Sequence, residues 1–127
     1  MKLIEWRCWN PEKKKWEFFS HFSILMYYED IIYHIKNGSE QYLYSGLLDV
    51  NNIHVYESDY IQLCSPDEEW IGIVKFIPEQ NKGWVVSFKD EDVPLFDVAF
   101  DNHGNISLHV IGDIFNKPID KIGLENV

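Results

Sequence analysis

The chain has 127 residues, of which 46% are hydrophobic and 16% aromatic, and its formal net charge is −10. This length predicts one domain, or a small domain with an appendage, and it is sufficient to bury a core without a metal or a disulfide. No run of about 18 apolar residues occurs, so we expect no membrane-spanning helix, and the early polar residues argue against a signal peptide.

The charge is distributed unevenly along the chain. Residues 1–40 carry six basic and six acidic groups, whereas residues 41–127 carry five basic against fifteen acidic groups. Duplex nucleic acid is therefore not expected as a partner, because phosphate contacts need clustered Lys and Arg side chains. Solubility is the simplest explanation of the acidic excess, and the alternative is a surface that attracts a basic protein or mimics nucleic acid.

The residue types that carry most enzyme chemistry show no recognisable spacing. Cys8 and Cys64 lie far apart among apolar residues, so we expect free buried thiols and a reducing cytoplasm. Neither a Gly-rich phosphate loop nor a Gly-x-Ser-x-Gly elbow occurs, and a nucleophilic pairing of Cys8 with a distant His is not favoured. We therefore predict no catalytic residue, no cofactor and no metal, since the histidines lack ligand spacing: His21, His34, His54, His103 and His109.

The amino-terminal residues are predicted to form a β-hairpin. Residues 3–9 and 15–22 have strand composition, and the intervening Asn-Pro-Glu-Lys is typical of a turn, because Pro11 presets its first central φ. This hairpin would bring Trp9 and Trp16 near its end. We predict that residues 1–41 form an amino-terminal hairpin region, an appendage to the main domain.

Residues 23–36, "SILMYYEDIIYHIK", allow two interpretations. Apolar residues fall at helical spacing, Ser23 is a suitable amino-terminal cap, and Asn37-Gly38 is a suitable stop. However, the residues are mostly β-branched and aromatic, and Glu29-Asp30 is suited to a hairpin turn. We favour two short strands and keep one short helix as the alternative.

Residues 42–127 contain a succession of short predicted strands joined by polar turns. An exposed loop is expected at 89–94 and a hairpin loop at 101–105, where Gly104 can take a positive φ. Gly112, inside the last apolar segment, predicts a bulge or a close backbone approach. The spacing predicts a small barrel or sandwich, in an all-β or β-rich α+β fold, with strands at 60–64, 70–77, 84–88, 96–100 and 106–111.

The stretch "YLYSGLLDVNNIHVYESDYI" resembles the hallmark of the YopX family of phage and prophage proteins, roughly Tyr-Thr-Gly-Leu-Lys-Asp-x-Asn-Gly-x-x-Ile-Tyr-Glu-Gly-Asp-Ile-Val. "RCWNPEKKKW" (7–16) and "HVIGDIFNKP" (109–118) resemble the patterns near the two ends of that family. The sequence departs from the hallmark glycines at Asn52 and Ser58, and it has Leu48 in place of Lys and Tyr60 in place of the hydrophobic residue after the second Asp. The matching positions are Tyr44, Gly46, Leu47, Asp49, Asn51, Tyr56, Glu57 and Asp59.

The resemblance implies an SH3-like barrel in the carboxy-terminal part, which we expect over residues 42–127. It also implies a phage or bacterial origin and a location in the host cytoplasm. It brings no catalytic residues to this chain.

The acidic residues of the hallmark have three possible roles. Glu57 and Asp59 resemble an acid–base pair, but that chemistry needs a cleft and a perturbed pKa. The segment also lacks the ladder of a calcium loop. We favour the role of turn residues, whose carboxylates accept backbone N–H bonds where the chain reverses. The candidate motif residues are thus assigned to structural turns and kept as a possible site: Gly46, Asp49, Asn52, Tyr56, Glu57 and Asp59.

Three functional hypotheses follow from these features. The first is a non-enzymatic accessory or interaction protein of a phage or prophage. The second is an acidic decoy that occupies a nucleic-acid-binding host protein, and the third is a small enzyme with a carboxylate site. The aromatic-rich, charge-balanced residues 1–40 need a surface to pack on, so we also expect a homo-oligomer, and a basic protein is the other expected partner.

Overall fold

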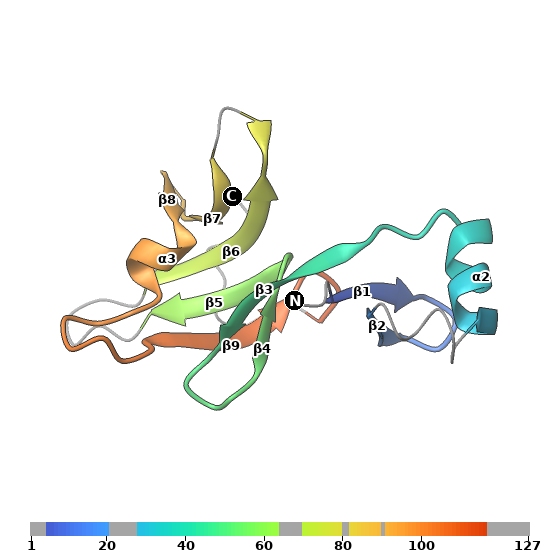
Figure 1. Ribbon diagram of the computed structural model, residues 1–127, viewed down its shortest axis with the longest axis horizontal. Helices are drawn as coiled ribbons and strands as arrows, with labels where there is room; N and C mark the ends of the chain where they lie inside the picture. Colours follow the sequence, from blue (N-terminus) through green and yellow to red (C-terminus); the bar gives the residue numbers. More distant parts are fainter. Residues whose placement is uncertain (1–4, 21–27, 64–69, 80–81, 90, 117–127) are drawn as a thin grey trace. The chain divides into compact units, whose positions relative to one another are not determined.

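The computed structural model describes residues 5–20, 28–63, 70–79, 82–89 and 91–116. The chain divides into two compact units, Met1–Tyr44 and Ser45–Val127, and each is described by itself below. The described residues form two antiparallel sheets, one of them curled into a half-barrel, and two short helices (Figure 1). The predicted β-rich, barrel-like fold is confirmed. None of the described helices is long and apolar enough to cross a membrane.

The first unit begins with the predicted hairpin. Strands β1 (Glu5–Asn10) and β2 (Lys15–Ser20) pair antiparallel, with Trp9 opposite Trp16. The two indole rings meet edge to face, with centroids 5.4 Å apart, an arrangement that stabilises cross-strand pairs. At the turn, the Asn10 side-chain oxygen accepts the backbone N–H groups of Glu12 and Lys13, both at 3.1 Å. The hairpin register is therefore fixed at its tip.

Residues 28–36 form a helix, α2 (Tyr28–Lys36), so the favoured pair of strands is wrong there and the alternative is correct. Two backbone bonds close its end, from Gly38 N–H to the Ile35 carbonyl (3.3 Å) and from Ser39 N–H to the His34 carbonyl (3.0 Å). Gly38, with φ 62°, supplies the left-handed residue that this Schellman motif needs. The Asn37-Gly38 stop signal therefore predicts the structure of this segment better than its β-branched composition does. The rest of the predicted segment, residues 23–27, lies outside the described residues.

Strand β3 (Tyr42–Leu48) begins in the first unit and ends in the second. In the first unit its residues Tyr42 and Leu43 pair antiparallel with Arg7 and Trp6 of β1. Strand β4 (His54–Tyr56) follows, and the strand order of this sheet is β2-β1-β3-β4.

The second unit contains a five-stranded antiparallel sheet of order β8-β7-β6-β5-β9 (Figure 1). Alternation places one apolar face of these strands inward, as expected for a curled sheet that closes on its own core. The fully buried members of the core include Val55, Ile61, Val74, Val86 and Leu108. The strands are β5 (Asp59–Leu63), β6 (Trp70–Ile77), β7 (Gly83–Ser87), β8 (Asp92–Pro94) and β9 (Leu108–Asp113).

The segment 92–100 differs from the prediction. Residues 92–94, expected in a loop, form the edge strand β8, and the strand expected at 96–100 is replaced by the short helix α3 (Leu95–Val98). Leu95 and Ala99 are fully buried in the core, with Val98 packed beside them. This is the i, i+3, i+4 spacing of a helical face, which the alternation of Phe96, Val98 and Phe100 conceals.

Two glycines of the curled sheet sit at special positions. Opposite β5, the register of β9 shifts between Gly112 and Val110, so the irregularity predicted at Gly112 is present. Gly72 of β6 lies against β7, where an added Cβ would come within 2.5 Å of Val86 Cγ1. The sheet therefore depends on the missing side chain at position 72.

Candidate functional site

The loop from Asp49 to Ile53 joins β3 and β4 and is held by the buried Asp49 carboxylate. Asp49 Oδ1 accepts the backbone N–H groups of Asn51 (2.8 Å) and Ile53 (2.9 Å). Its Oδ2 accepts the N–H of Val110 on β9 at 3.0 Å. Asp49 therefore performs the turn role expected of it, and it also ties the loop to a strand about 60 residues away in the sequence, a separation that no local pattern specifies.

The turn Glu57-Ser58 joins β4, which ends at Tyr56, to β5, which begins at Asp59. The buried Asp59 carboxylate accepts the backbone N–H of Tyr56 at 2.8 Å, and Tyr56 itself is buried. Ser58 donates its N–H to the Val74 carbonyl at 2.8 Å, which fixes the turn to β6. Glu57 is half-buried in this turn. Asp59 is thus engaged with the backbone at the chain reversal, as expected of a turn residue.

Three motif positions take the left-handed backbone conformation. Asn52 has φ 63° and Ser58 has φ 74°. Gly46 of β3 has φ 88°, and a Cβ placed there would meet no atom within 4 Å. Backbone conformation, and not close packing, is therefore the requirement at Gly46.

The same loop exposes aliphatic side chains. Val50 is 42% exposed and Ile53 is 47% exposed, and Leu48, just before the loop, is also exposed. The Asn51 side-chain amide lies 2.9 Å from His109 Nε2 of β9, so the loop is held by side-chain as well as backbone bonds. The second unit thus presents apolar groups on a fixed loop. Exposed aliphatic residues on a fixed loop are candidates for contact with a partner.

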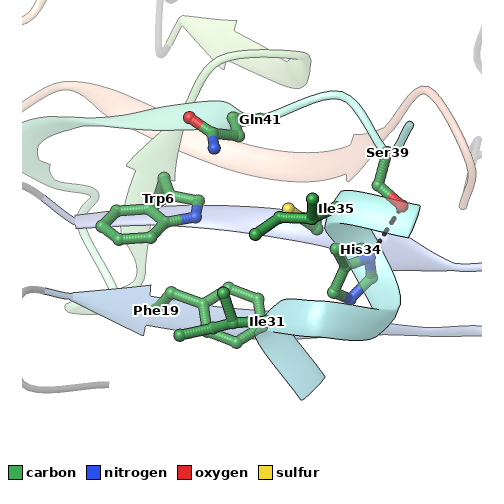
Figure 2. Close-up of a pocket in the computed structure, with 8 residues that line it drawn as sticks. Trp6, Phe19, Ile31, His34, Ile35, Ser39 and Gln41 are labelled. Carbon is green, nitrogen blue, oxygen red and sulfur yellow. Dashed lines mark hydrogen bonds between the residues drawn. The ribbon is translucent and has the colours of Figure 1, made fainter. Parts of the chain in front are cut away.

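A pocket of about 90 Å³ lies within the first unit, between the hairpin and helix α2 (Figure 2). The period of two in the hairpin puts Trp6, Cys8 and Phe19 on one face. The helical spacing i, i+3, i+4 puts Ile31, His34 and Ile35 on the facing side of α2. Ser39 and Gln41, from the segment after the helix, complete the lining.

His34 is buried and bound at both ring nitrogens. Its Nδ1 lies 2.7 Å from Ser39 Oγ, the bond drawn in Figure 2, and its Nε2 lies 2.8 Å from Glu17 Oε1. The rings of Phe19 and Tyr33 meet the imidazole edge to face, with centroids 5.6 Å and 5.1 Å away. The ring is therefore fixed in its plane.

The Glu17 carboxylate is the acidic side chain that His34 contacts. Burial opposes its ionisation, but hydrogen bonds from Asn10 and His34 and the electrostatic attraction of the His34 and Lys13 side chains outweigh burial and lower the pKa of Glu17. Asn10 Nδ2 donates to Oε1 at 2.9 Å, and Lys13 Nζ lies 4.0 Å from Oε2. Glu17 is therefore an ionised acceptor at neutral pH.

Cys8 lines the pocket as a buried free thiol, as expected, whereas Cys64 lies outside the described residues. Burial and the negative charge of Glu17 raise the pKa of Cys8 to about 11. The thiol therefore stays protonated at neutral pH. Because the thiolate is the reactive form, Cys8 is an unreactive, apolar lining residue of the pocket.

The group Glu17–His34–Ser39 is absent from the sequence-based candidates. Two features could have indicated this group. One is the hairpin register, which puts Glu17 opposite Cys8, and the other is the helical alternative for residues 28–36. Among the described residues no group of three or more His, Cys, Asp or Glu side chains is arranged to hold a metal ion. Comparison of the chain with family models, curated proteins and solved structures found no match.

Proposed function

We propose that the chain is a phage- or prophage-type accessory protein of the host cytoplasm whose second unit acts by binding a basic protein partner. The observation that carries this proposal is the fixed loop at Asp49–Ile53, which exposes Val50 and Ile53. An apolar contact on a preorganised loop loses little conformational entropy when it binds. In the described turns, the carboxylates of Asp49 and Asp59 are engaged with the backbone, which favours a structural role for them.

Charge favours a basic partner. Residues 41–127 carry fifteen acidic against five basic groups, so the whole formal charge of −10 resides there. Several exposed acidic residues lie within or beside β8 and α3: Glu91, Asp92, Asp97 and Asp101. Such a field accelerates association with a basic protein and weakens as salt rises.

The resemblance to the YopX family supports the phage or prophage origin. The left-handed conformations of Asn52 and Ser58, at two of the three positions where the hallmark has glycine, agree with a shared turn geometry. Asparagine and, less readily, serine can replace glycine at such positions when the surrounding bonds hold them.

The test is affinity capture from bacterial lysate with the full chain and two variants. Val50→Ser combined with Ile53→Ser removes the loop's apolar contact, and Phe96→Ser, another exposed apolar residue of the second unit, is the matched control. We expect basic proteins that are captured by the wild type and by Phe96→Ser, lost by the loop variant, and released by added salt. Identical capture by all three chains would refute the loop as the contact.

The acidic decoy is the second candidate function, and the same acidic excess favours it. A decoy occupies the nucleic-acid site of its partner, so added duplex DNA should displace the chain from the captured protein. An accessory protein that binds elsewhere should stay bound. Competition with duplex DNA at constant ionic strength therefore separates the two candidates.

A further inference from the structure

The bonds of His34 determine where its ring proton lies. An ionised carboxylate can only accept hydrogen bonds, so the 2.8 Å contact with Glu17 Oε1 places the proton on Nε2 of the neutral ring. Nδ1 then carries a lone pair directed at Ser39 Oγ, 2.7 Å away, and the Ser39 hydroxyl donates to it. A hydroxyl, a base and an orienting carboxylate are thus connected in series, which is the arrangement that activates a serine nucleophile.

The three residues are held by separate structural features. Glu17 is held by Asn10 at the hairpin turn, His34 by the rings of Phe19 and Tyr33, and Ser39 by the backbone bonds that end α2. Because the Schellman motif uses only backbone atoms of Ser39, its hydroxyl is not required to end the helix. The hydroxyl is therefore available for chemistry.

The pocket beside Ser39 suits a small apolar group. Its walls include Trp6, Cys8, Phe19 and Ile31, and its volume is about 90 Å³. A water molecule occupies about 30 Å³ of liquid, so this space fits an acyl chain of about two to four carbons. Trp6 and Gln41 also line this space (Figure 2), and their indole and amide groups carry N–H donors.

We propose that Ser39 is a nucleophile that cleaves short-chain carboxylic esters, with His34 as its base and Glu17 as a positioning residue. In the first step His34 Nδ1 takes the hydroxyl proton while Ser39 Oγ forms a bond to the ester carbonyl carbon. The carbonyl π electrons move to oxygen, then return and expel the alkoxide. The alkoxide takes the proton from His34 Nδ1 and leaves as the alcohol.

Water completes the reaction. His34 Nδ1 takes a proton from the water, whose oxygen attacks the acyl carbon of the Ser39 ester. When the tetrahedral intermediate collapses, the bond to Ser39 Oγ breaks and that oxygen recovers the proton from His34. The products are one carboxylic acid and one alcohol, and Ser39, His34 and Glu17 return to their starting states.

The experiment measures hydrolysis of p-nitrophenyl acetate and butyrate by the full chain, and the intact mass after treatment with a fluorophosphonate. We expect one adduct, mapped to Ser39, and hydrolysis that Ser39→Ala reduces to the rate in buffer. Ser107→Ala is the matched control, because that hydroxyl donates only to the backbone carbonyls of Val98 (3.1 Å) and Ala99 (3.4 Å). Circular dichroism verifies that each variant is folded.

Glu17→Gln tests the positioning role. An amide can donate to Nε2 and thereby moves the ring proton to Nδ1, so kcat should fall by about 100-fold or more. The ¹⁵N shifts of His34 should report the changed tautomer, which a merely structural loss would not produce, and Glu17→Asp should restore part of the rate. A wild-type chain without an adduct on Ser39, or ester hydrolysis unchanged in Ser39→Ala, would overturn the proposal.

Discussion

Aspartate carboxylates close the chain reversals of the second unit. Asp49, Asp59, Asp101 and Asp113 each accept at least one backbone N–H within four residues, and Asp49 also accepts that of Val110. The local bonds follow from sequence, because aspartate beside Asn, Gly or Ser favours such turns. The bond to Val110 does not, because it depends on which strands meet.

Asp49→Ala should lower the free energy of unfolding by about 2–3 kcal/mol, since it leaves three backbone N–H groups without their acceptor in a partly buried site. Urea melts measure this value. Asp101→Ala is the control, because its two backbone bonds lie in an exposed loop where water can replace the carboxylate. A loss below about 1 kcal/mol for Asp49→Ala would contradict an anchoring role for this residue.

Asn52→Gly should leave stability unchanged or raise it by roughly 0.5–1 kcal/mol, because glycine adopts a φ of 63° without strain. Asn51→Gly is the matched control. Asn51 lacks the positive φ and its side chain contacts His109 at 2.9 Å, so its loss should destabilise the loop. If urea melts show Asn52→Gly losing more than about 1 kcal/mol, the Asn52 side chain makes a bond that the turn needs.

At the scale of elements, helix α2 shows why the pocket was not predicted. Local composition favoured two strands over residues 23–36, and in a strand His34 lies on the face opposite to Ile31 and Ile35. The helix brings them together, and Ser39 joins them through the cap that follows. The same competition between period two and period 3.6 explains α3, where tertiary burial of Leu95 and Ala99 determines the outcome.

The contact between His34 of α2 and Glu17 of the hairpin should stabilise the fold less in acid. The pKa of Glu17 is lower in the folded chain, so its stabilisation is complete above the unfolded pKa and is lost as pH falls through the folded value. The difference in unfolding free energy between wild type and Glu17→Gln, about 1–2 kcal/mol at neutral pH, should therefore shrink as pH falls below the ordinary glutamate pKa of about 4.3.

Glu12→Gln controls for the loss of one negative charge in the same hairpin, since Glu12 is exposed and bonds to Asn10 through its backbone N–H and not through its carboxylate. Chemical denaturation at several pH values measures all three chains. A difference between wild type and Glu17→Gln that grows as pH falls below the ordinary glutamate pKa of about 4.3 would have the wrong sign for a lowered pKa and would contradict a stabilising Glu17–His34 contact.

Gly72→Ala should destabilise the curled sheet by about 1–3 kcal/mol, because the new methyl group would meet Val86 Cγ1 at 2.5 Å and the Ser87 carbonyl oxygen at 3.0 Å. Val86→Ala removes the nearest atom. The double variant should therefore lose less stability than the sum of the two single variants, which urea melts of a double-mutant cycle would measure. Strict additivity would show that the sheet opens at Gly72 without strain.

For the chain as a whole, composition and alternation predicted the β-rich class and the strands β5, β6, β7 and β9, because alternation is a local property that survives into the sheet. It did not predict the order β8-β7-β6-β5-β9 or the edge strand β8, since pairing between distant segments leaves little trace in one sequence. Among the described residues of the first unit, Phe18 is 57% exposed and Ile35 is 67% exposed.

This exposure bears on the expected homo-oligomer. Residues 1–40 carry six basic and six acidic groups, so copies that meet through the first unit avoid the repulsion of the acidic second unit. We expect light scattering coupled to size exclusion to give a multiple of the 15.1 kDa chain mass at tens of micromolar. Ile35→Glu, which puts a charge on an exposed helical position, should lower that mass, whereas Phe96→Glu in the second unit should not. A wild-type chain that elutes as a monomer would refute the expected homo-oligomer. An oligomer that is lost only in Phe96→Glu would show that the interface lies in the second unit.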